Sequence, residues 1–418
     1  MDAVIISIGT ELTTGQQIDT NSAWLAAELT ELGADVVGFQ TVGDEAGRIG
    51  VAVRRALDAA DLVVLTGGLG PTPDDLTREG LAQAIGVPLE ESPEALRQIR
   101  SFFERVQRPM PGSNVAQAML PRGCELLSNP RGTAPGIHYC RDETHLYALP
   151  GVPTEMKVMF SQSIAPLLMA LPGDQHPREI RLRCFGLSEA RVGELLADLM
   201  GRDRNPLIGI TASDAVLTIR VFGRGRDATE TDELIRADAC EIRNRLGEAI
   251  FGEGDDTLEG VVAAVLTTRG ETIATAESCT GGLLAKRLTD MPGSSAYFIQ
   301  GCITYSNWAK KQLLGVPEEL LVKHGAVSEQ VAEAMAFGCR TKAGSDFALS
   351  VTGIAGPGGG QPPDKPVGLV WCGMAHAGGV QAKRALLGEH LDRAEIRDRA
   401  CKTVLNLLRL HLPRGKPG

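Results

Sequence analysis

Short apolar runs that end in glycine-rich turns and lead into helix-like runs are the feature that most restricts the fold of this 418-residue chain. The run Ala3 to Ile8 leads into Gly9, and the run Asp61 to Thr66 leads into Gly67 and a helical pattern from Leu76 to Ile85. Apolar runs of this length predict buried strands. Strands that alternate with helices favour an α/β fold in which helices cover both faces of a parallel sheet.

The turn after the strand at residues 61–66 reads Gly67-Gly68-Leu69-Gly70-Pro71-Thr72-Pro73-Asp74-Asp75. A strand, a glycine turn and a helix in this order form anion sites in α/β folds. Two adjacent carboxylates would repel a phosphate, so Asp74 and Asp75 indicate that a divalent cation such as Mg²⁺ lies between them and the anion. The alternative is that Asp74 only caps the following helix.

Two further loops carry carboxylates after predicted strands. Glu11 follows the first strand, and Asp44 follows the strand Val36 to Val42, while a helix is expected from Ala23 to Leu32. The carboxyl ends of parallel strands meet at one edge of a sheet, so these side chains are expected to form one acidic metal site. The expected metal ligands are Glu11, Asp44, Asp74 and Asp75.

A similar pattern in the last third of the chain places a serine between a strand and a helix. Ser278 lies between the strand-like run Glu271 to Ala276 and a helix-like run that begins at Leu283. We expect the Ser278 hydroxyl at a helix N-terminus, where unpaired backbone N–H groups and the helix dipole would stabilise an oxyanion. The alternatives are that Ser278 only caps the helix, or that the neighbouring Cys279 is the nucleophile.

A serine nucleophile needs a base, and histidine is scarce. The chain has 7 His, and those in the last third form no Ser/His/Asp pattern. A lysine whose pKa is lowered by burial is a substitute, because a neutral amine accepts a proton. Lys310, on a predicted helix, is the first choice and Lys311 the second. The alternative is that both lysines are solvated surface charges.

A third glycine-rich segment, Gly353 to Gly360, lies between the strand-like runs Phe347 to Val351 and Val367 to Cys372. Glycine at this density lets a backbone approach a ligand closely, and such loops often hold phosphate through backbone N–H groups. A flexible linker has a similar composition, but a linker would not be flanked by strands on both sides. The segment is therefore expected to be a site loop.

From about Leu258 to Leu410 the chain resembles the nicotinamide mononucleotide deamidase domain of the competence/damage-inducible CinA family. The resemblance is carried by Ala276 to Gly282, Tyr305-Ser306-Asn307 with Ala309-Lys310, and Val351 to Gly360. It implies hydrolysis of nicotinamide mononucleotide to nicotinate mononucleotide and ammonia without a cofactor, with Ser278 as nucleophile, Lys310 as base, and Tyr305 and Thr352 as supporting hydroxyls. The implied substrate-binding residues are Thr280, Gly281, Gly282, Gly353, Gly356, Gly358 and one of Arg393 and Arg397, unless these arginines only pair with Asp392 or Glu395.

The region from Met1 to about Pro172 resembles the molybdopterin-binding-like domain of the same family. The resemblance is carried by Gly9 to Leu12, Asp19 to Ser22, Thr66 to Thr77 and Leu149 to Pro153. It implies a three-layer α/β domain with metal-dependent ADP-ribose pyrophosphatase activity; a domain that only binds a pterin or a nucleotide is the alternative. The implied substrate-binding residues are Asn21, Thr66, Gly67, Gly68, Gly70 and Asn114.

Between these regions, Arg178 to about Gly252 reads strand, helix, strand, strand, helix, and resembles the small α+β KH-like segment of the same family. A KH domain grips nucleic acid through a Gly-x-x-Gly turn, which this segment lacks. Residues 176–250 contain 12 Arg, no Lys and 13 acidic residues, so they have no excess of positive charge that would attract a polyanion. A structural or dimer-forming role is expected, without specific nucleic-acid binding.

Composition agrees with a cytoplasmic protein of several domains. The hydrophobic content is 43%, and the net charge of −10 disfavours nonspecific binding to DNA or membranes. Nine Cys without regular spacing fit reduced thiols, and no apolar run approaches the ~20 residues of a membrane span. The expected domains are residues 1–172, 173–252 and 253–418.

Taken together, these patterns predict a bifunctional pyridine-nucleotide hydrolase of NAD metabolism, expected as a homodimer. Its partners would be pyridine nucleotides and ADP-ribose. One alternative is a deamidase with a single activity, whose N-terminal domain only binds a nucleotide or a pterin. The other is a non-catalytic partner protein in DNA uptake or recombination.

Overall fold

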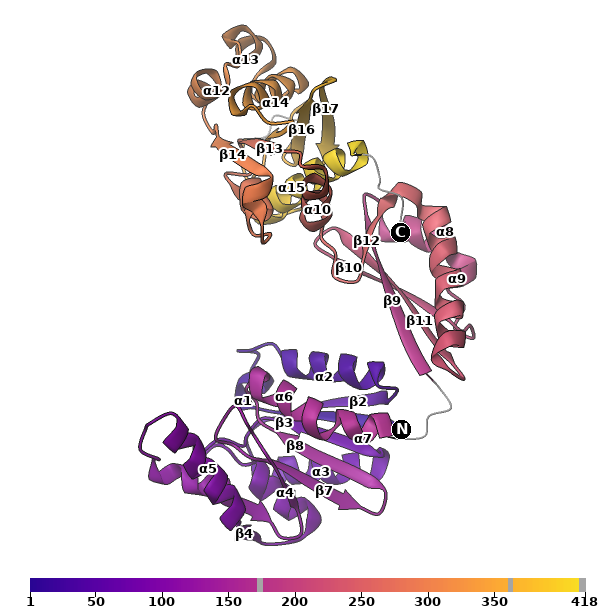
Figure 1. Ribbon diagram of the computed structural model, residues 1–418, viewed down its shortest axis with the longest axis vertical. Helices are drawn as coiled ribbons and strands as arrows, with labels where there is room; N and C mark the ends of the chain where they lie inside the picture. The colour runs from indigo at the N-terminus through magenta and orange to yellow at the C-terminus, as the bar shows by residue number, and fades with distance from the viewer. Residues whose placement is uncertain (171–175, 360–363, 413–418) are drawn as a thin grey trace. The chain divides into compact units, whose positions relative to one another are not determined.

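The computed structural model describes residues 1–170, 176–359 and 364–412 (Figure 1). The expected boundary between residues 172 and 173 and the end of the third glycine-rich segment, Gly360, lie outside these ranges. No helix within the described ranges has the length and the hydropathy needed to cross a membrane.

The chain divides into two compact units. One consists of Met1–Arg178 with Arg224–Asp232, and the other of Glu179–Gly223 with Glu233–Gly418. The second unit contains two separate sheets, one from the middle segment and one from the C-terminal segment. The expected three-part α/β architecture is therefore confirmed at the level of its sheets.

The N-terminal sheet has six strands in the order β2-β1-β3-β8-β7-β6. The first four in this order are parallel, but β7 is antiparallel to both of its neighbours, β8 and β6. The expectation of a wholly parallel sheet is therefore wrong at this edge, because a short turn with Asp142 at φ 57° joins β7 to β8 and can connect only antiparallel strands. The strands are β1 (Asp2–Ile8), β2 (Asp35–Val42), β3 (Leu62–Thr66), β6 (Glu125–Leu127), β7 (Gly136–Arg141) and β8 (Thr144–Leu149).

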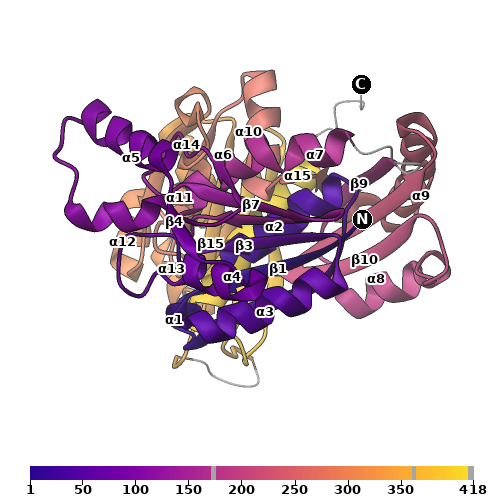
Figure 2. The same ribbon diagram turned by 90° about the horizontal axis from the view of Figure 1, so that it is seen from below.

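Helices cover both faces of this sheet (Figure 1), and Figure 2 shows it from the side of α3 and α4. Along β1, Ala3 and Ile5 pack with α2 and α6, whereas Val4 and Ile6 pack with α3 and α4. Both faces of a central strand are thus buried, which explains its continuous apolar run. The helices are α1 (Thr10–Thr13), α2 (Thr20–Glu31), α3 (Ala46–Ala59), α4 (Thr77–Ile85), α5 (Pro93–Arg105), α6 (Pro153–Ser163) and α7 (Ala165–Ala170), and β4 (Leu89–Glu91) pairs with β5 (Met119–Pro121) beside the 3₁₀ helix η1 (Gly112–Ala118).

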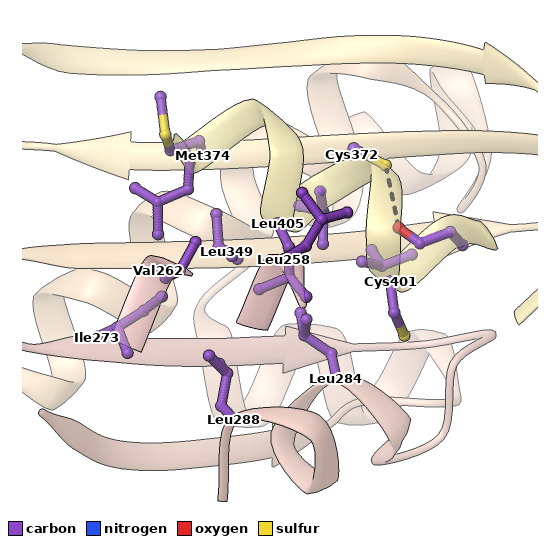
Figure 3. Packing of buried hydrophobic residues seen from close by; sticks show 14 of the residues in the cluster. Leu258, Val262, Ile273, Leu284, Leu288, Leu349, Cys372, Met374, Cys401 and Leu405 are labelled. Carbon is purple, nitrogen blue, oxygen red and sulfur yellow. Dashed lines mark hydrogen bonds between the residues drawn. The ribbon is translucent and has the colours of Figure 1, made fainter. Parts of the chain in front are cut away.

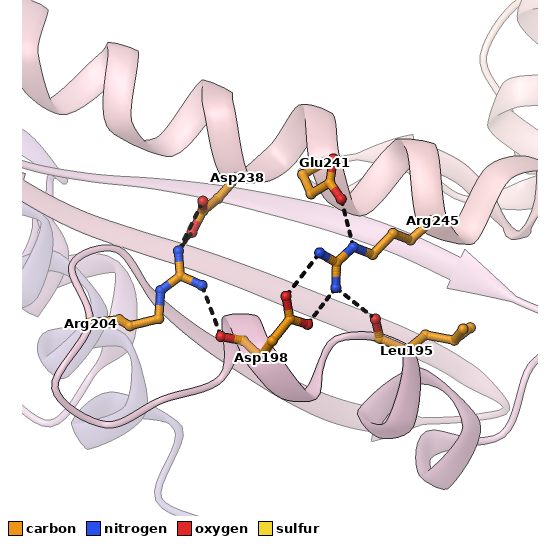
Figure 4. A network of polar contacts seen from close by, with 6 residues as sticks. All are labelled: Leu195, Asp198, Arg204, Asp238, Glu241 and Arg245. Atoms are coloured by element: carbon orange, nitrogen blue, oxygen red, sulfur yellow. Dashed lines mark hydrogen bonds and ion pairs between the residues drawn. The ribbon is translucent and has the colours of Figure 1, made fainter.

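The middle segment forms a four-stranded sheet in the order β10-β11-β9-β12. Several of its arginines pair with acidic groups of the same segment, as Figure 4 shows for Arg204 with Asp238 and for Arg245 with Asp198 and Glu241. The elements follow the expected KH-like order, which is confirmed. They are β9 (His176–Phe185), α8 (Glu189–Leu195), η2 (Ala197–Leu199), β10 (Leu207–Ser213), β11 (Val216–Gly225), α9 (Ala228–Leu246), η3 (Gly247–Ala249) and β12 (Ile250–Glu253).

The C-terminal sheet has the order β14-β13-β15-β16-β17. The first three strands are parallel, and β16 is antiparallel to both of its neighbours, β15 and β17. The strands are β13 (Ile273–Glu277), β14 (Phe298–Ile303), β15 (Phe347–Gly353), β16 (Leu369–His376) and β17 (Gly379–Leu386). The helices are α10 (Leu258–Arg269), α11 (Leu283–Thr289), α12 (Asn307–Leu314), α13 (Glu318–His324), α14 (Glu329–Ala343) and α15 (Arg393–His411), with η4 (Ser294–Ala296) before β14.

A large apolar core fixes one face of this sheet. Figure 3 shows Leu258 and Val262 of α10, Leu284 of α11 and Leu405 of α15 around Leu349 of β15. A fully buried aliphatic side chain of this kind stabilises the fold by roughly 1.5–3 kcal/mol. The strand ends that carry the candidate site therefore stand on a rigid base.

Connectivity creates a topological switch point at the carboxyl ends of the parallel strands. From β13 the chain passes through α11 to β14 on one side, while β15 lies on the other side of β13. Ligands of open α/β sheets bind at such a topological switch point. Ser278 follows β13, Tyr305 follows β14, and the third glycine-rich segment begins at the end of β15.

Candidate functional site

A direct contact between Ser278 and Lys310 is the centre of the C-terminal site. The Lys310 Nζ atom lies 3.0 Å from Ser278 Oγ, and it also donates to the Thr304 carbonyl at 2.8 Å. The Ser278 N–H donates to the Val351 carbonyl at 2.9 Å, which ties the turn that carries Ser278 to β15. Lys310 is only 1% exposed, and no acidic side chain in the described part of the chain forms an ion pair with it.

Burial changes the pKa values of Lys310 and Cys279. It lowers the pKa of Lys310 from 10.5 to about 8, because the ammonium form is poorly solvated. Burial also raises the pKa of Cys279 to about 11, so the thiol stays protonated and is a poor rival nucleophile. Lys311 is exposed and pairs with Glu318. The geometry therefore favours Lys310 over Lys311 as the base.

The position of Ser278 relative to α11 differs from the expectation. The N-cap of α11 is Gly282, so Ser278 lies four residues before the N-cap and does not cap the helix. The free N–H groups at the helix start go to the carboxylate of Glu277 instead, which accepts from Gly282, Leu284 and Ala285 at 2.9, 3.0 and 2.8 Å. The expected oxyanion site at the helix N-terminus is therefore wrong.

Arg393 joins two loops of the site. Its guanidinium donates to the Tyr305 hydroxyl at 2.9 Å and to the Gly356 carbonyl at 2.6 Å. Arg393 and Tyr305 are both exposed. Asp392 and Glu395 form the capping box of α15, and neither forms an ion pair with Arg393 or Arg397. An exposed guanidinium that bridges the loops is well placed for an anionic substrate group.

Arg397, one helical turn further along α15, donates hydrogen bonds to the turn that carries Ser278. Its Nε and Nη2 atoms donate to the Thr280 carbonyl at 3.2 and 2.6 Å. The turn itself needs glycine, because Gly281 and Gly282 have left-handed φ values of 58° and 96°. Arg397 therefore holds the protein backbone, unlike Arg393.

The remaining expected residues of this site hold or shape the protein backbone. Thr352 is buried, and its hydroxyl donates to the Ala326 carbonyl at 2.8 Å. A Cβ atom at Gly353 would lie 2.8 Å from the Leu369 carbonyl, and Gly356 has a left-handed φ of 70°, whereas Gly358 has open space around it. Close packing thus requires glycine at the first position, and backbone conformation requires it at the second.

The N-terminal unit contains a cavity of about 400 Å³ above the carboxyl ends of its parallel strands. All four expected carboxylates line it, together with Gly67, Gly68 and Gly70. Glu155, at the start of α6, also lines it and was not predicted. The carboxylates are Glu11, Asp44, Asp74 and Asp75.

Three expected substrate-binding residues of this unit hold the walls of the cavity. Thr66 donates to the Pro150 carbonyl at 3.1 Å, and Asn21 donates to the Gly151 carbonyl at 2.8 Å. Asn114 donates to the side chain of Gln117 at 2.7 Å, and Gln117 donates in turn to a carbonyl of the glycine turn. None of the three lines the cavity itself.

Sequence reasoning missed Arg78, which lies beneath the glycine turn. Its guanidinium donates to the carbonyls of Leu69 and Gly70, both at 2.8 Å, and the residue is only 3% exposed. Burial lowers the pKa of Arg78, although it remains charged. A buried cation that holds these carbonyls adds positive charge close to the expected anion site.

The carboxylates do not form a preassembled metal cage. Within residues 1–170, 176–359 and 364–412, no three His, Cys, Asp or Glu side chains lie close enough together to hold an ion. Asp44 accepts from the Thr10 N–H at 2.6 Å, and Asp75 accepts from the Thr72 N–H at 2.8 Å. Asp74 does not cap α4, whose N-cap is Leu76. Carboxylate oxygens nevertheless fit Mg²⁺, which usually takes one or two of them together with waters and substrate phosphate.

Comparisons with known proteins match all three parts of the chain. Residues 4–170 match the model of a probable molybdopterin binding domain, residues 180–252 match the damage-inducible protein CinA KH domain, and residues 255–412 match the CinA C-terminal domain.

Relatives match along the whole length. A putative competence-damage inducible protein of Symbiobacterium thermophilum is 43% identical over 424 residues, and a CinA-like protein of Geobacter sulfurreducens is 44% identical over 415 residues, each match covering 99% of both chains. The crystal structure of competence/damage inducible protein CihA from Agrobacterium tumefaciens matches 38% of this chain and 94% of its own, with 43% identity and a TM-score of 0.36.

Proposed function

The chain belongs to the competence-damage-inducible protein (CinA) family, and from this premise we propose that its C-terminal domain hydrolyses nicotinamide mononucleotide to nicotinate mononucleotide and ammonia. The observation that carries the proposal is the 3.0 Å contact between a serine hydroxyl and a buried lysine amine. With the pKa of Lys310 at about 8, roughly one lysine in ten is neutral at pH 7. That neutral fraction can accept the serine proton.

The reaction begins when Lys310 takes the proton of Ser278 and the alkoxide attacks the carboxamide carbon. The N–H groups of Cys279 and Thr280 are the donors available for the resulting oxyanion, because neither forms a hydrogen bond within the described residues. The Lys310 ammonium then protonates the leaving nitrogen, and ammonia departs. Water attacks the acyl-enzyme with Lys310 again as the base, which releases the acid and restores Ser278.

Binding of the nucleotide phosphate is assigned to Arg393. It is exposed and already bridges Tyr305 and the Gly356 loop, whereas Arg397 is committed to the Thr280 carbonyl. Guanidinium groups recognise phosphate through two parallel hydrogen bonds. Tyr305 orients Arg393, and Thr352 supports the site by holding the loop at Ala326.

Ammonia release from nicotinamide mononucleotide tests this proposal. Ser278→Ala should reduce the rate by a factor on the order of 10⁴ or more, because it removes the covalent route. Ser345→Ala is the matched control, since it removes another buried serine hydroxyl, which donates to the Phe347 carbonyl at 2.7 Å. A folded Ser278→Ala enzyme with the rate of this control would overturn the assignment.

A second activity is favoured by the acidic cavity of the N-terminal unit. Carboxylates next to a glycine turn and a buried arginine suit a diphosphate substrate that arrives with a divalent metal. Asp74 and Asp75, with Glu11 and Asp44, would hold the metal, which would neutralise charge on the diphosphate as water attacks. The substrate assigned to this cavity is ADP-ribose.

A further inference from the structure

A buried carboxylate beside the nucleophile has no part in the chemistry described above. Glu277 is the last residue of β13 and is 1% exposed. Within the described residues it forms no ion pair, and its two oxygens accept three backbone N–H groups from the start of α11. A buried charge is tolerated when it is fully hydrogen-bonded, and an apolar side chain here would leave the three N–H groups without acceptors.

The carboxylate imposes a particular shape on the chain. Glu277 precedes Gly282 by five residues, so its side chain reaches the helix start only if the intervening residues fold back into a tight turn. That turn is closed by the Gly281 N–H, which donates to the Ser278 carbonyl at 3.1 Å. The two left-handed glycines supply the reversal. The hydrogen bonds of the carboxylate therefore fix the conformation of the segment that carries Ser278.

The backbone of the same residue fixes the base. The Glu277 carbonyl accepts the Thr304 N–H at 2.7 Å, and the Thr304 carbonyl accepts the Lys310 ammonium at 2.8 Å. One residue is thus connected to both reacting side chains, to Ser278 through the turn and to Lys310 through Thr304. Because the side chain and the backbone act separately, substitution of the side chain tests the first connection alone.

We propose that Glu277 is a positioning residue for the nucleophile. By accepting the N–H groups of Gly282, Leu284 and Ala285, its carboxylate holds the turn so that Ser278 Oγ stays beside Lys310 Nζ. The same turn leaves the N–H groups of Cys279 and Thr280 without acceptors and ready for an oxyanion. This inference rests on the proposed Ser278 nucleophile, but not on the identity of the amide substrate.

Glu277→Gln tests the proposal, since it keeps the size of the side chain and replaces one acceptor oxygen with an NH₂ group that faces N–H donors. Even a misplacement of about 1 Å can cost on the order of 100-fold in rate. The matched control is Glu259→Gln, another carboxylate that contacts α11, through Arg287 at 2.8 Å and away from the turn.

Labelling by a fluorophosphonate, followed by intact mass, reports on Ser278 without any nucleotide. The Ser278 oxygen forms a bond to phosphorus, fluoride leaves, and the serine proton passes to Lys310. We expect the labelling rate constant of Glu277→Gln to fall on the order of 100-fold, with the final extent still one label per chain. A variant of which a part was irreversibly misfolded would instead label to a lower extent at the normal rate.

The outcomes separate the two proposals. Equal rate constants for Glu277→Gln and Glu259→Gln overturn the positioning role and leave the deamidase proposal intact. A wild-type protein that is labelled but releases no ammonia overturns only the substrate. A wild-type protein that is not labelled at Ser278 overturns both. If Glu277→Gln does not fold, Ala285→Pro removes one of the three N–H donors in the first helical turn, where proline is tolerated, and is expected to slow labelling in the same way.

Discussion

Both candidate sites lie at the carboxyl ends of parallel strands, in two separate sheets, but their electrostatics are opposite. In the C-terminal domain, a single amine is buried to 1% exposure, no acidic side chain among the described residues pairs with it, and burial lowers its pKa to about 8. In the N-terminal unit, five carboxylates line an open cavity of about 400 Å³, and Asp74 is exposed. The C-terminal site favours the neutral form of the Lys310 amine, whereas the N-terminal site brings several negatively charged carboxylates together.

This contrast shows which parts of each site the chain supplies by itself. Ser278 and Lys310 are held at hydrogen-bonding distance by contacts to the protein backbone, so the dyad needs no added group. The acidic cavity holds no three ligands close together in the described residues, so under the proposed function a divalent cation would have to join these carboxylates to an anionic substrate. The C-terminal site is therefore preorganised, whereas the N-terminal site would be completed by what it binds.

The largest effect expected to separate the two sites comes from Lys310→Met. Deamidation should fall by a factor of about 10³–10⁴, because the general base is lost. Stability should rise at pH 7, because holding the ammonium form costs the folded state roughly 3 kcal/mol at about 1.4 kcal/mol per pKa unit. The lowered pKa fixes the sign, since the cost is complete below pH 8 and fades between about pH 8 and 10.5.

Urea unfolding at pH 7 and pH 10, beside ammonia assays, checks both parts of this prediction. Lys311→Met is the control, because that lysine is exposed and pairs with Glu318. It should change neither activity nor stability appreciably. A Lys310→Met protein that is less stable than the control variant, or equally active, would remove the contrast between the two sites.

The next effect should appear only in the N-terminal unit. The double variant Asp74→Asn/Asp75→Asn should lower Mg²⁺-dependent hydrolysis of ADP-ribose by a factor on the order of 10²–10³, with ammonia release unchanged. Removal of the metal with EDTA should have the same selective effect. Asp58→Asn is the control, since Asp58 is exposed and pairs with Arg141. Full hydrolysis by the double variant would mean that these carboxylates hold no catalytic metal.

A smaller effect is expected from pH. The deamidation rate should fall about tenfold for each unit below pH 8, because only the neutral form of Lys310 accepts the serine proton. Initial rates of ammonia release from pH 6 to 9 check this slope. A rate that stays constant over this range would show that the base is not an amine with a pKa near 8.

The smallest effects should separate the two arginines. Arg393→Lys should raise KM for the nucleotide about tenfold with a smaller change in kcat, because a bidentate phosphate contact is lost. Arg397→Lys should lower kcat and leave KM nearly unchanged, because Arg397 holds the Thr280 carbonyl of the nucleophile turn. Steady-state kinetics of both variants check the assignment, and the opposite pattern would exchange the roles.

Much of the fold and the main pair of site residues could be predicted from the sequence. The patterns placed strands before Gly67, Ser278 and Gly353, and the structure has β3, β13 and β15 there. The sequence also predicted the Ser278 and Lys310 pair, which the structure brings to 3.0 Å although 32 residues separate them. Strong local signals, namely glycine turns and apolar runs, carry these predictions.

What the sequence could not show depends on contacts across the fold. The start of α11 was predicted correctly at Leu283, but nothing local indicated that Glu277 would reach back to its N–H groups. A glutamate at a strand end usually remains solvated, so a buried one gives no signal. Arg78 is similar, because only the folded turn brings the Leu69 and Gly70 carbonyls to its guanidinium.

The central claim is that the buried amine at Lys310 is neutral enough near pH 7 to activate Ser278. The most direct test is the titration of this side chain by NMR of the protein with isotope-labelled lysines, assigned by comparison with Lys310→Arg. The account predicts a lysine resonance that titrates near pH 8 and is missing from the variant. A Lys310 resonance that titrates near 10.5, as for a solvated lysine, would contradict it.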